Sequence, residues 1–159
     1  RRVGVNPTLL IVTGARRIAE RPEAFAAART WLLARVLVLN PAGIITGDAR
    51  CIDESAQSIA SERGIPWQVY DKRGMIQRSE GRAVRWTSEV PPATNAGRHA
   101  WAAWLHRRNE TMARRTAMLR DRYDVRLVGL FSSTPGTSGT GMTVDCARAA
   151  GIPCETAVF

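Results

Sequence analysis

Lysine and cysteine are scarce in this chain of 159 residues, and each scarcity excludes a class of site. Lys72 is the only lysine, and no loop has the GxxxxGK[ST] pattern of nucleoside triphosphatases. The three cysteines, Cys51, Cys146 and Cys154, are odd in number and too widely spaced for a zinc site or a disulfide framework. The two histidines have no cysteine or third histidine nearby. We therefore expect reduced thiols, no metal site and no cofactor.

Long apolar runs are also lacking. The longest, residues 9–12, has the length of a buried strand and not the roughly 18 residues of a membrane helix. The opening residues 1–4, Arg-Arg-Val-Gly, have neither the apolar core nor the cleavage site of a signal peptide. We expect a cytoplasmic protein that does not bind a membrane.

The composition is that of a folded protein with a basic surface. Hydrophobic residues make up 45% of the chain and charged residues 23%, the balance of a soluble globular protein, and the length of 159 residues predicts a single domain over residues 1–159. The net charge of +9 favours an anionic partner, either a nucleic acid or a phosphate-bearing ligand. The arginines are scattered along the chain and form no basic tail, so nucleic-acid binding is kept as an alternative.

Apolar runs and helical patterns alternate along the sequence. Strands are expected over residues 8–12, 43–46, 65–70, 125–131 and 152–158, and helices over 22–36, 53–63, 98–121 and 142–150. This order predicts an α/β fold: a single Rossmann-like domain with a mostly parallel sheet of about five strands flanked by helices. Residues 71–95 break the rhythm and are expected to form a surface insertion or a lid, with a short strand near 83–86.

Three strands end in loops of small residues that lead into helices, at residues 13–16, 46–49 and 132–141. The carboxyl ends of parallel strands share one edge of a sheet, where ligands bind. Glycine allows backbone N–H groups to approach a phosphate, and a helix N-terminus adds partial positive charge. The ligand-binding residues predicted in these loops are Gly14, Ala15, Arg16, Gly47, Asp48, Ala49, Gly136, Thr137, Ser138, Gly139 and Thr140.

Polar residues on two of the helices extend this candidate site. Arg108 and Asn109 could reach a base, a ribose or a phosphate, or could belong to a solvated charged face. Asp53, like Asp48, could accept a hydrogen bond from a ribose hydroxyl or complement the start of the second helix. We expect Arg108 and Asn109 to face the same sheet edge as the three loops. The chain has no GxSxG motif and no Ser/His/Asp arrangement, and we assign no catalytic residue.

Four motifs, in order, resemble those of one known family: TGARR (13–17), IITGDARCIDESA (44–56), RRNETM (107–112) and GTSGTGMTVDCARAAGIP (136–153). The chain resembles the SLOG superfamily, especially its YspA/YpsA-like branch, which is related to the LOG and DprA Rossmann-like domains. The resemblance covers most of the chain and leaves out residues 71–95. It implies a Rossmann-like sheet that binds nucleotides, nucleosides or ADP-ribose-type molecules through Gly14, Arg16, Gly47, Ala49, Asp53, Arg108, Asn109, Gly139 and Thr140.

The resemblance also implies two alternative functions. Related cytokinin-activating enzymes cleave the N-glycosidic bond of nucleoside monophosphates with a PGGxGTxxE loop; here Thr143 stands at the glutamate position, and Asp145 follows two residues later. The DNA-uptake protein DprA implies binding of single-stranded DNA. Our preferred hypothesis is the binding or sensing of a nucleotide-derived small molecule by a homo-oligomer, in a phage, plasmid or defence context. The first alternative is a nucleotide N-glycosidase or phosphoribohydrolase.

Overall fold

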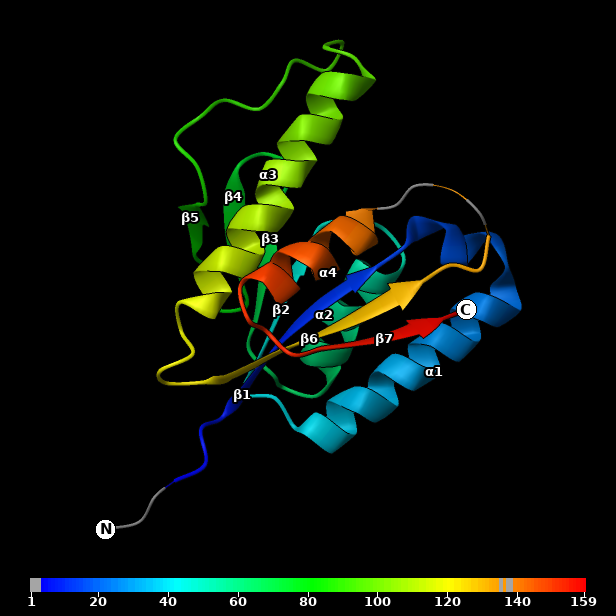
Figure 1. Cartoon of the computed structure of the whole chain (residues 1–159), viewed down its shortest axis with the longest axis vertical. Coiled ribbons are helices and arrows are strands. Elements are labelled where there is room, and N and C mark those ends of the chain that lie inside the picture. Colours follow the sequence, from blue (N-terminus) through cyan, green and yellow to red (C-terminus); the bar gives the residue numbers. More distant parts are fainter. Residues whose placement is uncertain (1–3, 135, 137–138) are drawn as a thin grey trace.

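A single seven-stranded sheet runs through the protein in the order β5-β4-β3-β2-β1-β6-β7 (Figure 1). The computed structural model describes residues 4–134, 136 and 139–159. Five strands pair in parallel, and the two at one end are antiparallel. The strands are β1 (Thr8–Gly14), β2 (Gly43–Gly47), β3 (Trp67–Tyr70), β4 (Met75–Arg78), β5 (Ala83–Arg85), β6 (Asp124–Phe131) and β7 (Cys154–Val158).

The prediction of an α/β fold is confirmed, but the prediction of about five mostly parallel strands is wrong. The sheet is mixed, because residues within the 71–95 insertion form β4, which pairs antiparallel with β3, and β5, which pairs antiparallel with β4. A short strand was expected near residues 83–86, and it forms as β5. Strand β4 was not predicted, because its residues Met75–Arg78 alternate only weakly between apolar and polar.

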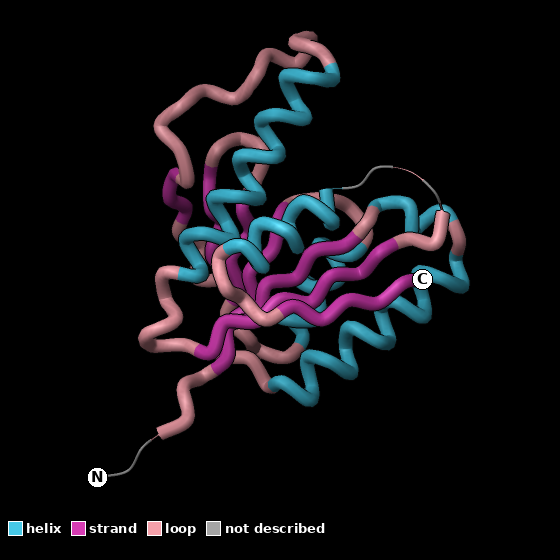
Figure 2. Tube along the Cα trace, in the orientation of Figure 1, coloured by secondary structure: helices cyan, strands magenta, loops and turns pink. Residues whose placement is uncertain are grey.

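Helices cover both faces of the sheet (Figure 2). They are α1 (Pro22–Leu39) and α2 (Ile52–Glu62) on one face, and α3 (Arg98–Ala117) and α4 (Gly139–Ala149) on the other, with a short 3₁₀ helix η1 (Arg16–Glu20) before α1. The helix expected to end at residue 121 ends at 117, and the one expected to begin at 142 begins at 139. Within the described residues, no helix is both long enough and apolar enough to cross a membrane.

The central strand β1 joins the two halves of the core. Leu10 and Val12 pack among residues of α1 and α2, whereas Leu9 and Ile11 pack among residues of α3 and α4. Successive side chains of a strand point to opposite faces of the sheet. The unbroken apolar run of β1 is therefore explained by burial on both faces, as in other parallel sheets.

The insertion is anchored to α3 by two tryptophans. The Trp86 indole donates to the carbonyl of Asp71 at 2.9 Å, and the Trp104 indole donates to the carbonyl of Lys72 at 2.8 Å. The two rings lie 4.9 Å apart and are both buried. The N-terminal half of α3 projects beyond the sheet beside this segment (Figure 1). The insertion thus widens the sheet and supports α3.

Gly14, at the end of β1, lies directly beneath the start of α2. A Cβ atom at Gly14 would come within 2.3–2.5 Å of three side-chain carbons of Ile52, which is fully buried. From the sequence alone, we expected this glycine to let a ligand approach the backbone closely. The structure shows that close packing between β1 and α2 requires it as well.

We predict that Gly14→Ala destabilises the fold by about 1–3 kcal/mol, the usual cost of overpacking a core. The free energy of unfolding in urea measures this effect. Gly4→Ala is the matched control, because a Cβ there meets nothing within 4 Å. Equal stability of Gly14→Ala and the wild type would contradict the packing described here.

Candidate ligand-binding site

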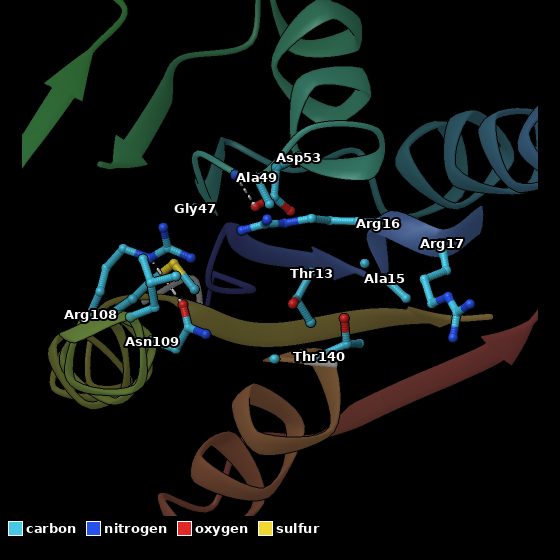
Figure 3. Close-up of a pocket in the computed structure, with 14 residues that line it drawn as sticks. Thr13, Ala15, Arg16, Arg17, Gly47, Ala49, Asp53, Arg108, Asn109 and Thr140 are labelled. Carbon is cyan, nitrogen blue, oxygen red and sulfur yellow. Dashed lines mark hydrogen bonds between the residues drawn. The ribbon is translucent and has the colours of Figure 1, made fainter. Parts of the chain in front are cut away.

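A pocket of about 280 Å³ opens at the carboxyl edge of the parallel strands (Figure 3). Its walls come from the ends of β1 and β2, the starts of η1, α2 and α4, and the middle of α3. The lining residues are Thr13, Gly14, Ala15, Arg16, Arg17, Gly47, Ala49, Asp53, Leu105, Arg108, Asn109, Met112, Gly139 and Thr140. The pocket is therefore located where ligands bind in open α/β sheets.

One face of α3 forms a wall of the pocket. Four of its residues line the pocket, and their spacing of three or four places them on the same side of the helix: Leu105, Arg108, Asn109 and Met112. Arg108 and Asn109 are buried, at 5% and 7% exposure. A solvated charged face, the other interpretation considered for this segment, is thereby excluded.

Arg108 is held in place by several groups. Its Nη1 forms an ion pair with Asp48 Oδ1, and its Nε donates to Asn109 Oδ1 at 3.1 Å. The other oxygen of Asp48 accepts from the backbone N–H of Lys72 at 2.9 Å. Arg108 Nη2 makes no hydrogen bond to any described residue and lies beside Gly47. The orientation of the guanidinium is thus fixed, and one of its nitrogens remains available to a ligand.

Further hydrogen-bond donors surround the pocket. Arg16 is exposed and has no ion pair among the described residues. The first backbone N–H groups of α4, beginning at Gly139 and Thr140, have no carbonyl partner within the helix. Asn109 Nδ2 lies next to Gly139, since a Cβ at that glycine would be 3.3 Å from it. The α4 N–H groups and Asn109 favour an anion at the α4 end of the pocket, whereas the Arg16 side chain extends toward Gly47 (Figure 3).

Asp53 is the one carboxylate among the described residues that line the pocket. It is 5% exposed, and its Oδ2 accepts from the backbone N–H of Ala49 at 3.1 Å. Its Oδ1 is buried and has no hydrogen-bond partner in the described part of the chain. Burial raises the pKa of Asp53 to about 7, although the nearby Arg108 charge and the Ala49 hydrogen bond favour its ionised form. Asp53 therefore changes charge close to neutral pH.

The structure brings most of the predicted site residues together. Ten of them line the pocket: Gly14, Ala15, Arg16, Gly47, Ala49, Asp53, Arg108, Asn109, Gly139 and Thr140. Asp48 is not among the lining residues; it contacts Arg108 instead. Gly136 is also outside the lining and packs against Arg17, where a Cβ would approach Nη1 to 2.5 Å. Thr137 and Ser138 lie outside the described residues.

Four lining residues were not predicted: Thr13, Arg17, Leu105 and Met112. Two of them had a signal in the sequence, because Leu105 and Met112 share a helical face with Arg108 and Asn109. Thr13 and Arg17 flank predicted residues of the first loop, but nothing in the sequence shows that they face the pocket. None of the insertion residues 71–95 lines the pocket; residues of this segment form β4 and β5 instead.

The two positions considered for a catalytic carboxylate lie apart from the pocket. Thr143 is buried, and its hydroxyl donates to the carbonyl of Gly139 at 2.9 Å. Asp145 is exposed on α4 and does not line the pocket. Among the described residues, no three His, Cys, Asp or Glu side chains cluster in a way that could hold a metal ion.

Comparison with known proteins adds no assignment. The chain matches no protein-family model, no curated protein and no solved structure.

We predict that ionisation of Asp53 lowers stability as the pH rises from about 4 to about 7. The folded protein binds this proton more tightly than the unfolded chain, whose aspartates titrate near pH 3.9. Its contribution is thus complete below pH 4 and is lost as the pH passes through 7. The free energy of unfolding of the wild type minus that of Asp53→Asn should fall by on the order of 2–4 kcal/mol over this range.

Glu54→Gln is the matched control for this titration. Glu54 lies in the same first turn of α2 but is exposed, and replacing it should not alter the pH profile. A pH-independent difference between the wild type and Asp53→Asn would show that Asp53 titrates normally.

Proposed function

We propose that the protein binds or senses a nucleotide or a nucleotide-derived small molecule, such as a nucleoside phosphate or an ADP-ribose-like compound. The observation that carries this proposal is the convergence of Arg16, Arg108 and the start of α4 on one pocket at the carboxyl edge of the sheet. Two guanidinium groups and free helix N–H groups are the donors that bind phosphate.

The arrangement of these donors favours the binding of a specific ligand over a general electrostatic attraction of anions to a basic surface. In Figure 3 the side chain of Arg16 extends from the start of η1 toward Gly47, and Arg108 approaches the pocket from α3. The Arg108 guanidinium is buried and fixed by Asp48 and Asn109, so little side-chain entropy is lost when it binds an anion. The volume of about 280 Å³ is close to the lower end for small-molecule pockets.

The resemblance to the SLOG superfamily supports the same ligand class, because its motif positions include nine of the lining residues. We favour binding over turnover for one structural reason. The position of the family's catalytic glutamate holds Thr143, which is buried and hydrogen-bonded to Gly139, and the nearby Asp145 lies outside the pocket.

We predict that Arg16→Gln weakens binding of the tightest ligand among AMP, ADP and ADP-ribose by about 1.5–3 kcal/mol, the range for a hydrogen bond to a charged group. Isothermal titration calorimetry measures the affinity. The substitution should leave the fold intact, since Arg16 is exposed and has no ion pair among the described residues.

Arg98→Gln is the control for net charge. Arg98 is exposed at the start of α3, seven residues before the first pocket residue of that helix. The nucleic-acid alternative would replace this proposal if no nucleotide in the panel bound and both substitutions reduced the affinity for a single-stranded oligonucleotide equally. That affinity would also have to depend steeply on salt concentration.

We also expect no enzyme-dependent release of adenine from AMP, because the pocket has no carboxylate at the Thr143 position. Chromatography of the reaction mixture after prolonged incubation measures free adenine. Release that depended on protein concentration would instead support the N-glycosidase alternative.

A further inference from the structure

Helix α1 is apolar on its outer side as well as on the side that packs against the sheet. Its inner side belongs to the core, and the helix lies at the periphery of the molecule (Figure 1). Between residues 24 and 39 its exposed residues are Ala26, Ala27, Thr30, Ala34, Leu37 and Val38. A helix that is apolar all round is normally buried on both sides. The outer face of α1, defined by these six residues, therefore lacks a covering partner within the described chain.

The neighbouring helix α2 shows how a solvent-facing surface is built in this protein. It packs in the same core layer as α1, but its exposed residues are all polar: Glu54, Ser58, Ser61 and Glu62. On the outer face of α1, in contrast, Thr30 is the only polar side chain, and Leu37 and Val38 are 51% and 71% exposed. Monomeric proteins rarely expose a contiguous apolar surface, so this difference indicates a contact site on α1.

The outer face of α1 carries no charge, although the chain has a net charge of +9. Two arginines flank it, and each is paired within its own chain: Arg29 with Glu62 at 3.6 Å and Arg35 with Glu155 at 2.7 Å. An acidic partner would be attracted to the unpaired arginines elsewhere on the protein. Two copies of a basic chain repel each other, and a neutral apolar face is the surface on which they meet at the lowest electrostatic cost.

The spacing of the exposed residues makes this face complementary to itself. Ala27, Thr30, Ala34 and Leu37 are separated by three, four and three residues, the spacing of a seam between packed helices. This spacing is the same from either end. In an antiparallel pair of α1 helices, Ala27 of one copy therefore lies against Leu37 of the other, and Thr30 lies against Ala34. Each leucine then fills the space that an alanine leaves, and both copies use the same surface, as a two-fold dimer requires.

We infer that the outer face of α1 is a dimerisation surface, on which α1 of a second copy packs antiparallel with Ala27 against Leu37 and Thr30 against Ala34. No residue of α1 lines the pocket, so this inference is independent of the proposed function. The helix has 18 residues and is about 27 Å long. A contact between two such helices is small for a specific interface, and we expect a weak dimer with a Kd on the order of 1–100 μM.

Sedimentation equilibrium of the wild type tests the dimer. Between about 1 μM and about 300 μM, the range for an interface of this size, the average mass should rise from 17.5 kDa toward twice that value. Ala34→Glu should remain monomeric, because a dimer would place two carboxylates on the apolar seam. Ala34 is exposed and glutamate is a good helix former, so the monomer should fold, which circular dichroism verifies. Ala102→Glu, the same substitution at an exposed position of α3, is the matched control and should dimerise like the wild type.

A charge pair across the seam tests the antiparallel alignment. Thr30→Lys alone should also be monomeric, since two ammonium groups would meet on the seam. An equimolar mixture of Thr30→Lys and Ala34→Glu should form a dimer again, because the introduced ammonium of one chain lies against the introduced carboxylate of the other. The second layer of that mixed dimer keeps the natural threonine and alanine.

Each outcome decides one part of the inference. A wild type that stays monomeric over this range would overturn it, and a dimer that survives in both Ala34→Glu and Thr30→Lys would place the contact on another surface. If the mixture of the two variants stayed monomeric, the antiparallel alignment would be wrong. Loss of the dimer in Ala102→Glu would attribute the effect to net charge and not to α1. None of these results bears on nucleotide binding, because the pocket lies outside α1.

Discussion

The ion pair between Arg108 and Asp48 organises the pocket. It links α3 to the loop after β2, and the second oxygen of Asp48 accepts the backbone N–H of Lys72, at the start of the insertion. Arg108 is buried and Asp48 is partly exposed, so removing Asp48 would leave the buried guanidinium without its compensating charge, which is costly. The sheet edge, the insertion and α3 therefore hold one another in position around a single guanidinium.

The charge balance at this edge explains the behaviour of Asp53. One buried guanidinium faces two carboxylates, and it forms its ion pair with Asp48. Asp53 receives some stabilisation from Arg108, but burial outweighs it, and the negative charge of Asp48 raises the pKa of Asp53 further. The same Asp48 that fixes Arg108 thus favours the neutral form of Asp53.

The sequence predicted the parallel part of the fold because its strands are buried on both faces and read as apolar runs, as in β1. It did not predict the antiparallel end of the sheet. Strands β4 and β5 have mixed polarity, and their position depends on tertiary contacts such as those of Trp86 with Asp71 and Trp104. Such contacts join residues distant in sequence and leave no periodic signal.

The glycine loops of the site were predictable because parallel strands bring their carboxyl ends together, and Arg108 and Asn109 were predicted to face the same edge. The separate role of each residue in the site was not predictable. Gly14 is required by the packing of Ile52, whereas Gly47 leaves room beside Asp53 and Arg108, although both glycines follow a threonine at a strand end. Likewise, Asp48 forms the ion pair with Arg108 Nη1, whereas Asp53 is buried and accepts a hydrogen bond from the backbone of Ala49. Identical residue types in similar loops thus acquire different functions from the side chains that the fold places against them.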